Sequence, residues 1–296
     1  MATETNSRNL QESSIERLAR TGRKLIGTRK GQVSLLLLVP ILLSSLFAPM
    51  IAPHDPTATN VADRFEEPSA EYVLGTDNFG RDLLSRVLYG GRASILLGVA
   101  ATALGLLLGV PVGILSGYIG GRTDEVVMRL MDILLSIPSL LLALIVVVAL
   151  GSGMVNAILA IGIVFMPRLA RITRSSTLSV KNEEYITAAE ARGESSLYIA
   201  FVELLPSVTP AIIVETSIRI GFGILIGTSL SFLGLGTQPP NPDWGYMVSQ
   251  ARTTLGESIW FMLWPSLTLG ATILGFNLFG DALRDTLDPE VTGEDR

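Results

Sequence analysis

The 296-residue sequence contains no cysteine and only one histidine, and charged residues make up only 17% of it. The lack of cysteine excludes a disulfide framework, a thiolate metal site and a cysteine nucleophile. A single imidazole excludes a multi-histidine metal site, and we interpret His54, in Ala-Pro-His-Asp-Pro, as a turn residue. Because these absences leave few groups for catalysis, we do not expect an enzyme.

Lysine is also scarce, since only Lys24, Lys30 and Lys181 are present, and none of them follows a glycine. The Gly-Lys-Ser/Thr loop that cradles nucleotide phosphates is therefore missing, as is the Gly-x-Ser-x-Gly elbow of hydrolases. The net charge is -5, and the basic residues flank apolar runs, which gives no sign of nucleic-acid binding. We expect this chain to bind no cofactor and no metal.

The sequence is rich in long apolar stretches. Hydrophobic residues make up 48% of the chain and its mean hydropathy is +0.48, whereas soluble domains carry about 25% charged residues. Five largely apolar stretches lie at 31–53, 93–121, 133–167, 207–233 and 258–280. A bilayer core takes about 20 helical residues to cross. The composition therefore predicts an integral membrane protein.

The stretch 133–167 is too long for one crossing, because as a helix it would measure about 52 Å. Gly151-Ser152-Gly153 supplies a turn in its middle. We therefore expect two spans here, the first beginning near Val126 and bent by Pro138. The predicted fold is all-α, with six transmembrane helices.

Basic residues lie unevenly about these spans. Of the 22 Lys and Arg residues, 16 fall in 1–31, 122–129, 168–192 and after 281. Such an excess is typical of cytoplasmic segments, so we expect both termini to be cytoplasmic. The expected organisation is a cytoplasmic basic N-terminal segment at 1–31, a first transmembrane helix at 32–53, an extracellular segment at 54–92, a five-helix core at 93–281 with a cytoplasmic loop at 168–206, and a cytoplasmic tail at 282–296.

Two of these non-membrane segments contain further helical patterns. In segment 1–31, Ile15, Leu18, Leu25 and Ile26 recur at helical spacing opposite basic residues, which favours an interfacial helix. The alternative is a partly disordered basic tail. In segment 54–92, a helix at the outer interface is expected to turn an apolar face inward and to leave three polar side chains exposed: Arg81, Asp82 and Arg86.

The loop 168–206 predicts two short helices joined by a glycine. Asn182 can cap the first, and Gly193 can end it in a left-handed conformation. The second is expected to begin near Ser195 and to stop at Pro206. Such a pair can form a knob that another protein grips, although a solvated connector is an equal alternative.

The residues of this loop resemble a motif of ABC importers. Thr187-Ala188-Ala189, then Gly193, then Leu205-Pro206 is similar to the Glu-Ala-Ala…Gly…Leu-Pro loop of their membrane subunits, although Thr187 replaces the usual Glu and Glu203 replaces an apolar residue. Blocks at 74–90, 231–245 and 276–289 resemble the C-type permease subunits of the dipeptide/oligopeptide/nickel branch. The resemblance covers about 35–289, nearly the whole chain.

This resemblance implies a type I importer permease in a prokaryotic cell membrane. It implies a B-type permease as partner in a heterodimer, two ATP-binding subunits that use the ATP, and an external substrate-binding protein. The residues it assigns to ATPase coupling are Thr187, Ala188, Ala189, Gly193, Leu205 and Pro206. Segment 54–92 would face the binding protein or the partner permease. Dipeptides or oligopeptides are the expected substrates, with nickel chelates or oligosaccharides as the alternative and an ion-coupled secondary transporter as a remote alternative.

One pair of charges falls inside an expected span. Glu215 and Arg219 are four residues apart with the acid first, the favourable order for an ion pair on one helix face. Charges at membrane depth usually face a bundle interior or a wet cavity. The pair would border the translocation path or form a neutralised contact at the interface between permeases.

Overall fold

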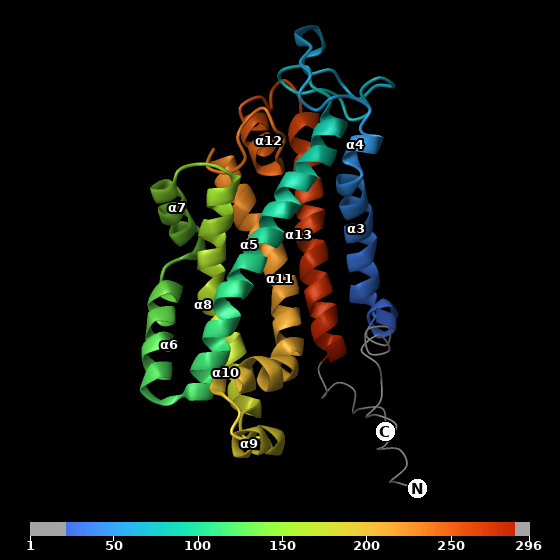
Figure 1. The fold of residues 1–296 in the computed structure, drawn as a ribbon. Helices are drawn as coiled ribbons and strands as arrows, with labels where there is room; N and C mark the ends of the chain where they lie inside the picture. The colour runs from blue at the N-terminus through green and yellow to red at the C-terminus, as the bar shows by residue number, and fades with distance from the viewer. Residues whose placement is uncertain (1–21, 288–296) are drawn as a thin grey trace.

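The computed structural model describes residues 22–287, and within them the chain is helical, with no β-strand (Figure 1). The long apolar helices are α3 (Arg29–Leu46), α5 (Leu83–Ile119), α8 (Met154–Val180), α11 (Leu205–Phe232) and α13 (Trp260–Leu287). A bent pair, α6 (Gly121–Ser136) and α7 (Ser139–Leu150), provides the sixth candidate span. The expected all-α membrane fold is thus confirmed.

The third span is broken rather than continuous. The axes of α6 and α7 differ by 93°, and the break lies at Ile137 and Pro138, where Ile137 is extended, the conformation favoured before a proline. Pro111 and Pro167 lie inside the continuous helices α5 and α8. The bend expected at Pro138 therefore divides a span, whereas Pro111 and Pro167 do not interrupt their helices.

The α5–α8 pair makes the most extensive helix contact in the described chain. Gly105, Gly109, Gly113 and Gly117 repeat every four residues along one face of α5. A Cβ on Gly113 would lie 2.4 Å from the carbonyl oxygen of Ala170 in α8. Small residues at such spacing allow helix backbones to approach closely in a membrane, so this glycine row brings α5 and α8 together.

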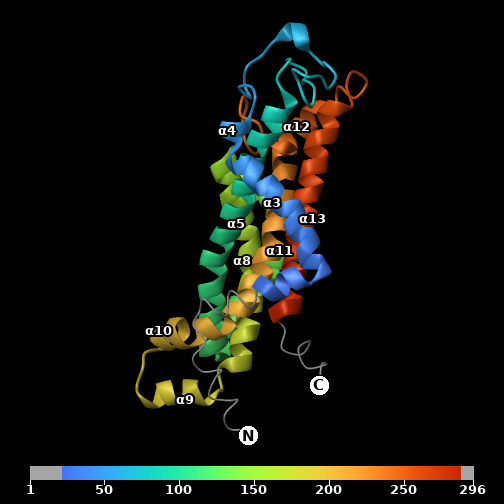
Figure 2. The ribbon, with the colours of Figure 1, turned by 90° about the vertical axis from the view of Figure 1, so that its right-hand side faces the viewer.

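Short helices lie at both ends of the long bundle (Figures 1 and 2). At one end, the α9 end, are α9 (Glu184–Ala191), α10 (Ser196–Tyr198) and the π-helical turn η2 (Ile199–Leu204). At the other, the α12 end, are α4 (Ala48–Ile51), η1 (Val61–Asp63) and α12 (Trp244–Ala251). The long helices connect the two ends.

Helix α5 begins ten residues before its apolar run at 93. The helix expected at the outer interface in segment 54–92 is therefore the first part of α5. Its residues Leu83 and Val87 pack with Trp244 and Phe261 in the core at the α12 end. The indole N–H of Trp244 donates to the carbonyl oxygen of Val87 at 2.9 Å. Tertiary packing therefore extends the helix beyond the apolar run that the sequence displays.

Of the expected interfacial helix in segment 1–31, residues 22–27 are helical and the rest lies outside the described residues. Leu25 is buried against Val214, Ala282 and Leu283, whereas Ile26 is exposed. This part of the segment therefore packs against α11 and α13 instead of depending on lipid alone. The expected tail beyond Leu287 also lies outside the described residues.

Candidate functional site

The knob, which we define as residues 184–204, projects across the direction of the long helices (Figure 2). Gly193 has φ +78 and no atom lies within 4 Å of a Cβ built on it, so a glycine is needed here for its left-handed backbone and not for space. Its N–H donates to the carbonyl oxygen of Glu190 at 2.9 Å. The expected end of the first helix at Gly193 is confirmed.

The expected boundaries around the knob are otherwise partly wrong. Glu183, not Asn182, is the N-cap of α9, and it makes no side-chain capping bond. Ser195 caps the second helix by accepting from the N–H of Tyr198 at 3.3 Å. That helix does not stop at Pro206, since η2 continues into α11, which has Pro206 in its first turn. Pro206 thus lies inside a continuous run of helix, just after the π-helical turn.

The two faces of α9 differ in exposure. Ile186 and Ala189 are fully buried in a cluster with Ile114 of α5 and Ile199 of η2. Thr187, Ala188 and Gly193 are exposed, as is Pro206, while Leu205 is partly buried. Ala189 therefore anchors the knob instead of facing a partner, and the sequence motif gave no signal for that division.

Polar contacts also hold the knob in place. The Tyr118 hydroxyl of α5 donates to Glu190 Oε1 at 2.9 Å. Arg192 Nη2 donates to Glu203 Oε1 at 3.1 Å, and both side chains are at least partly exposed. The polar residue that departs from the importer motif at 203 thus has a partner inside the knob. Tyr118 is far from the knob in sequence, so the motif could not reveal it.

The ion pair predicted inside the fifth span is present. Arg219 Nε donates to Glu215 Oε1 at 2.6 Å, and Arg168 Nε of α8 lies 3.7 Å from the same oxygen. The Arg219 guanidinium also lies over the rings of Phe165 and Phe222, at 5.6 and 5.2 Å from their centroids. The contact of Arg168 with Glu215 was not predicted, because the two residues lie on different helices and sequence spacing does not show which helices meet.

A cavity of about 510 Å³ opens beside this ion pair, between α8, α11 and α13. Its lining mixes apolar side chains with Ser176, Ser179 and Ser207, and Glu215 and Arg284 also line it. The sequence-predicted Glu215 therefore borders a cavity of mixed polar and apolar lining, whereas Arg219 does not line it.

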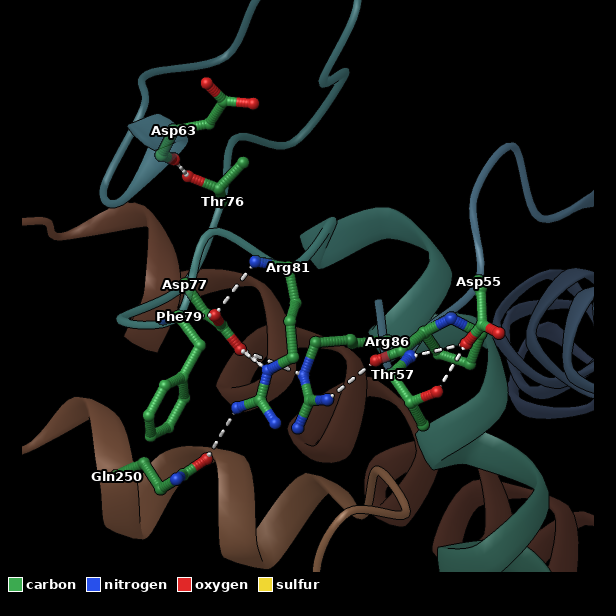
Figure 3. A network of polar contacts seen from close by, with 10 residues as sticks. Asp55, Thr57, Asp63, Thr76, Asp77, Phe79, Arg81, Arg86 and Gln250 are labelled. Carbon is green, nitrogen blue, oxygen red and sulfur yellow. Dashed lines mark hydrogen bonds and ion pairs between the residues drawn. The ribbon is translucent and has the colours of Figure 1, made fainter. Parts of the chain in front are cut away.

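A polar network stabilises the cap, which we define as residues 52–82 together with α12 (Figure 3). Asp77 Oδ2 accepts from Arg81 Nε at 2.6 Å and lies 3.2 Å from Arg86 Nε. Arg81 Nη2 donates to Gln250 of α12 at 3.4 Å, and Arg86 Nη1 donates to the carbonyl oxygen of Pro56 at 2.8 Å. The network thus ties the loop to α5 and α12.

The expectation that Arg81, Asp82 and Arg86 are exposed is wrong, because all three are buried. Asp77 contacts both arginines with its single negative charge, and Asp82 caps α5 by accepting from the N–H of Ser85 at 2.8 Å. His54 lies in a bend, as expected, and its N–H donates to Ser85 Oγ at 3.1 Å.

A further hydrogen bond lies in the outer part of the cap. The Tyr72 hydroxyl donates to Asp63 Oδ2 at 2.9 Å, and this bond raises the pKa of Tyr72 to about 12.

Within residues 22–287, no group of three or more His, Asp or Glu side chains converges on a metal position.

Long apolar helices with a knob at one end, a folded cap at the other and a cavity of mixed lining between α8, α11 and α13 are typical of a multi-pass membrane transport protein. Residues 109–293 match the family described as "Binding-protein-dependent transport system inner membrane component", and residues 18–68 match "N-terminal TM domain of oligopeptide transport permease C". The chain belongs to this family of transport permeases, and it is a multi-pass protein of the bacterial inner membrane.

Relatives cover most of the chain. It is 42% identical to the probable D,D-dipeptide transport system permease protein DdpC of Escherichia coli, over 92% of this chain and 93% of that protein. It is 40% identical to the di/tripeptide transport system permease protein DppC of Pseudomonas aeruginosa, over 87% of each. It is 41% identical to the glutathione transport system permease protein GsiD of Pectobacterium atrosepticum, over 86% of this chain and 84% of that protein.

Among solved structures, a chain of the methionine ABC transporter MetNI in inward-facing conformations shares the fold. The TM-score is 0.56 at 19% sequence identity, and the likeness covers 68% of this chain and 96% of that one. The type I importer permease fold expected from the motifs is thereby confirmed.

Proposed function

We propose that this chain is the C-type permease subunit of an ATP-driven importer of peptides. The relatives reported above are named for D,D-dipeptides, di/tripeptides and glutathione, and glutathione is itself a tripeptide. These names favour peptides over the nickel chelates and oligosaccharides that the motifs left open. Membership of the binding-protein-dependent family disfavours an ion-coupled secondary transporter.

The main support for a role in coupling is that one face of α9 is exposed while its opposite face is buried against the rest of the chain. Thr187, Ala188 and Gly193 are available to a partner, while Ala189 holds that face in place. We assign the exposed three to contact with an ATPase subunit. Leu205 and Pro206, at the start of α11, connect the knob to the fifth span. Because Thr187 is uncharged, it offers a neutral hydrogen bond in place of the charge-assisted bond of a glutamate.

The assembly proposed around the chain follows from its two ends. The α9 end, with the basic segments, would be cytoplasmic and would meet two ATP-binding subunits, which use the ATP while this chain binds no cofactor. The cap would face an external binding protein. A B-type permease would complete the path as a heterodimer, bordered in this chain by Glu215 and Arg219.

A substitution at Gly193 tests the coupling role. In the reconstituted importer, Gly193→Leu should preserve assembly and abolish peptide-stimulated ATP hydrolysis and uptake, since leucine is strained at φ +78. Gly256→Leu is the matched control, because Gly256 also has nothing within 4 Å of a Cβ and has no positive φ. Normal uptake by assembled Gly193→Leu complexes would contradict the coupling role.

A further inference from the structure

The cavity between α8, α11 and α13 has the size and chemistry of a ligand site. Its volume of about 510 Å³ falls in the range of about 300–1,000 Å³ typical of small-molecule pockets. Three serine hydroxyls line it. Ser179 Oγ donates to the carbonyl oxygen of Ser176 at 2.8 Å and Ser207 Oγ shares a hydrogen bond with the Tyr185 hydroxyl at 2.9 Å, and each oxygen keeps acceptor capacity. Hydroxyls of this kind suit the amide groups of a short peptide.

The charges at one edge of the cavity do not cancel. Arg168 and Arg219 contribute two positive charges against the one negative charge of Glu215. The Arg219 side chain is only 15% exposed and lies over two phenyl rings, whereas the Arg168 side chain is 53% exposed. Arg168 is therefore the cation whose guanidinium remains accessible.

Arg168 lies on the same face of α8 as two residues that line the cavity. Arg168, Ile172 and Ser176 are spaced four residues apart on α8 and so share one helix face, and the latter two line the cavity. Glu215, which Arg168 contacts, lines it as well. Arg168 begins the basic segment 168–206 that the sequence assigns to the cytoplasmic side, so its guanidinium lies toward that end of α8, and the same helix face leads to the cavity.

We propose that the cavity is a subsite for the terminal carboxylate of a peptide, with Arg168 as the residue that binds the carboxylate. This rests on the proposed peptide transport function. The guanidinium of arginine matches a carboxylate with two parallel hydrogen bonds. Glu215 positions Arg168, and the serine oxygens accept from the amide N–H groups of the peptide. Arg284, in the last turn of α13, is the arginine of the lining itself, and Arg168 lies at its edge beside Glu215.

The absence of cysteine makes the cavity directly testable, since single cysteines can be introduced one at a time. The complete importer is used in inside-out vesicles, with sulfonatoethyl methanethiosulfonate as an impermeant thiol reagent and mass spectrometry of this subunit as the readout. The Ser176→Cys and Ser179→Cys variants should react. Alanylalanine should slow that reaction, and alanylalanine amide, which lacks the carboxylate, should not.

Two controls assign the effect to Arg168. The Ser175→Cys variant, exposed but outside the lining, should react without protection by either peptide. Arg168→Gln should raise the alanylalanine concentration needed for half-protection about tenfold or more, as expected from losing a charge-assisted hydrogen bond, and Arg168→Lys should restore part of it.

The possible results separate this proposal from the proposed function. Failure of Ser176→Cys and Ser179→Cys to react would show that a protein surface, such as the partner permease, covers the cavity, and would overturn the subsite. Equal protection by the acid and the amide would overturn it as well. Uptake of alanylalanine with the binding protein present is measured separately, so peptide import can stand while the subsite fails.

Discussion

At the scale of single residues, the cluster of Arg168, Glu215 and Arg219 shows how charges are accommodated inside this bundle. Glu215 is 7% exposed at its side chain and contacts both arginines. Removing one partner of a buried ion pair leaves an uncompensated charge, which costs about 3–5 kcal/mol, whereas exposed pairs contribute about 0–1 kcal/mol. The position of a charge therefore decides what its loss does.

We expect Arg219→Met to destabilise the purified complex by less than the roughly 3–5 kcal/mol of a fully uncompensated buried charge, because Arg168 remains 3.7 Å from Glu215; the loss is measured as a fall in the thermal unfolding midpoint. Adding Glu215→Gln should recover part of the loss, because the carboxylate that has lost its hydrogen-bonded partner is then neutral. Arg171→Met is the control, since Arg171 pairs with Asp132 where both side chains are about half exposed. Equal losses in Arg219→Met and Arg171→Met would contradict this explanation.

A second residue-scale prediction concerns Asp243, which lies in the loop before α12. Its Oδ1 accepts from the N–H of Tyr246 at 3.1 Å, and Ser94 Oγ donates to Oδ2 at 3.3 Å. Burial raises the pKa of Asp243 above 3.8. The folded state therefore holds this proton more tightly than the unfolded state, and stability falls as the pH rises through the folded pKa.

Asp243→Asn should remove this loss while keeping an amide oxygen as the helix cap. The variant is expected to unfold at a higher temperature than the wild type at pH 7, with the difference shrinking toward pH 4. Asp243→Ala, which loses the cap, should be less stable than the wild type at pH 7. A lower midpoint for Asp243→Asn at pH 7 would argue against a charge cost at this site.

At the scale of elements, local patterns predict some features and miss others for physical reasons. Gly193 could be identified because a helix end needs a left-handed residue, and the Glu215–Arg219 pair because both lie on one helix face. The continuation of α5 from Leu83 into the apolar run could not, because it depends on packing against Trp244 and Phe261, which are distant in sequence. Arg168 was missed for the same reason, as its partner is on α11.

The glycine row of α5 leads to a prediction at this scale. Gly113→Ala places a methyl group 2.4 Å from the carbonyl oxygen of Ala170, and overpacking of this kind costs about 1–3 kcal/mol. Gly117→Ala should cost less, because its closest contact is 3.0 Å. Gly270→Ala is the control, with nothing within 4 Å. The thermal unfolding midpoint should be highest for Gly270→Ala, lower for Gly117→Ala and lowest for Gly113→Ala. Any other order would count against close α5–α8 packing.

At the scale of the whole molecule, the knob is connected to the opposite end of the bundle by two long helices. Ile186 packs against Ile114 of α5, and η2 runs directly into α11. At the α12 end, α5 holds Trp244 through the carbonyl oxygen of Val87. A displacement of the knob would therefore be carried by α5 and α11 toward the cap.

Loosening the base of the knob should weaken this connection without removing the exposed face of α9. Ile186→Ala takes buried methyl groups from the cluster, a change that typically costs about 2–5 kcal/mol in a core. We expect the complex to assemble and to hydrolyse ATP, but to import less peptide for each ATP consumed. Leu197→Ala, on an exposed side chain of the same knob, should leave that ratio unchanged. If Ile186→Ala kept the wild-type ratio of peptide imported to ATP hydrolysed, rigid attachment of the knob to α5 would not be required for coupling.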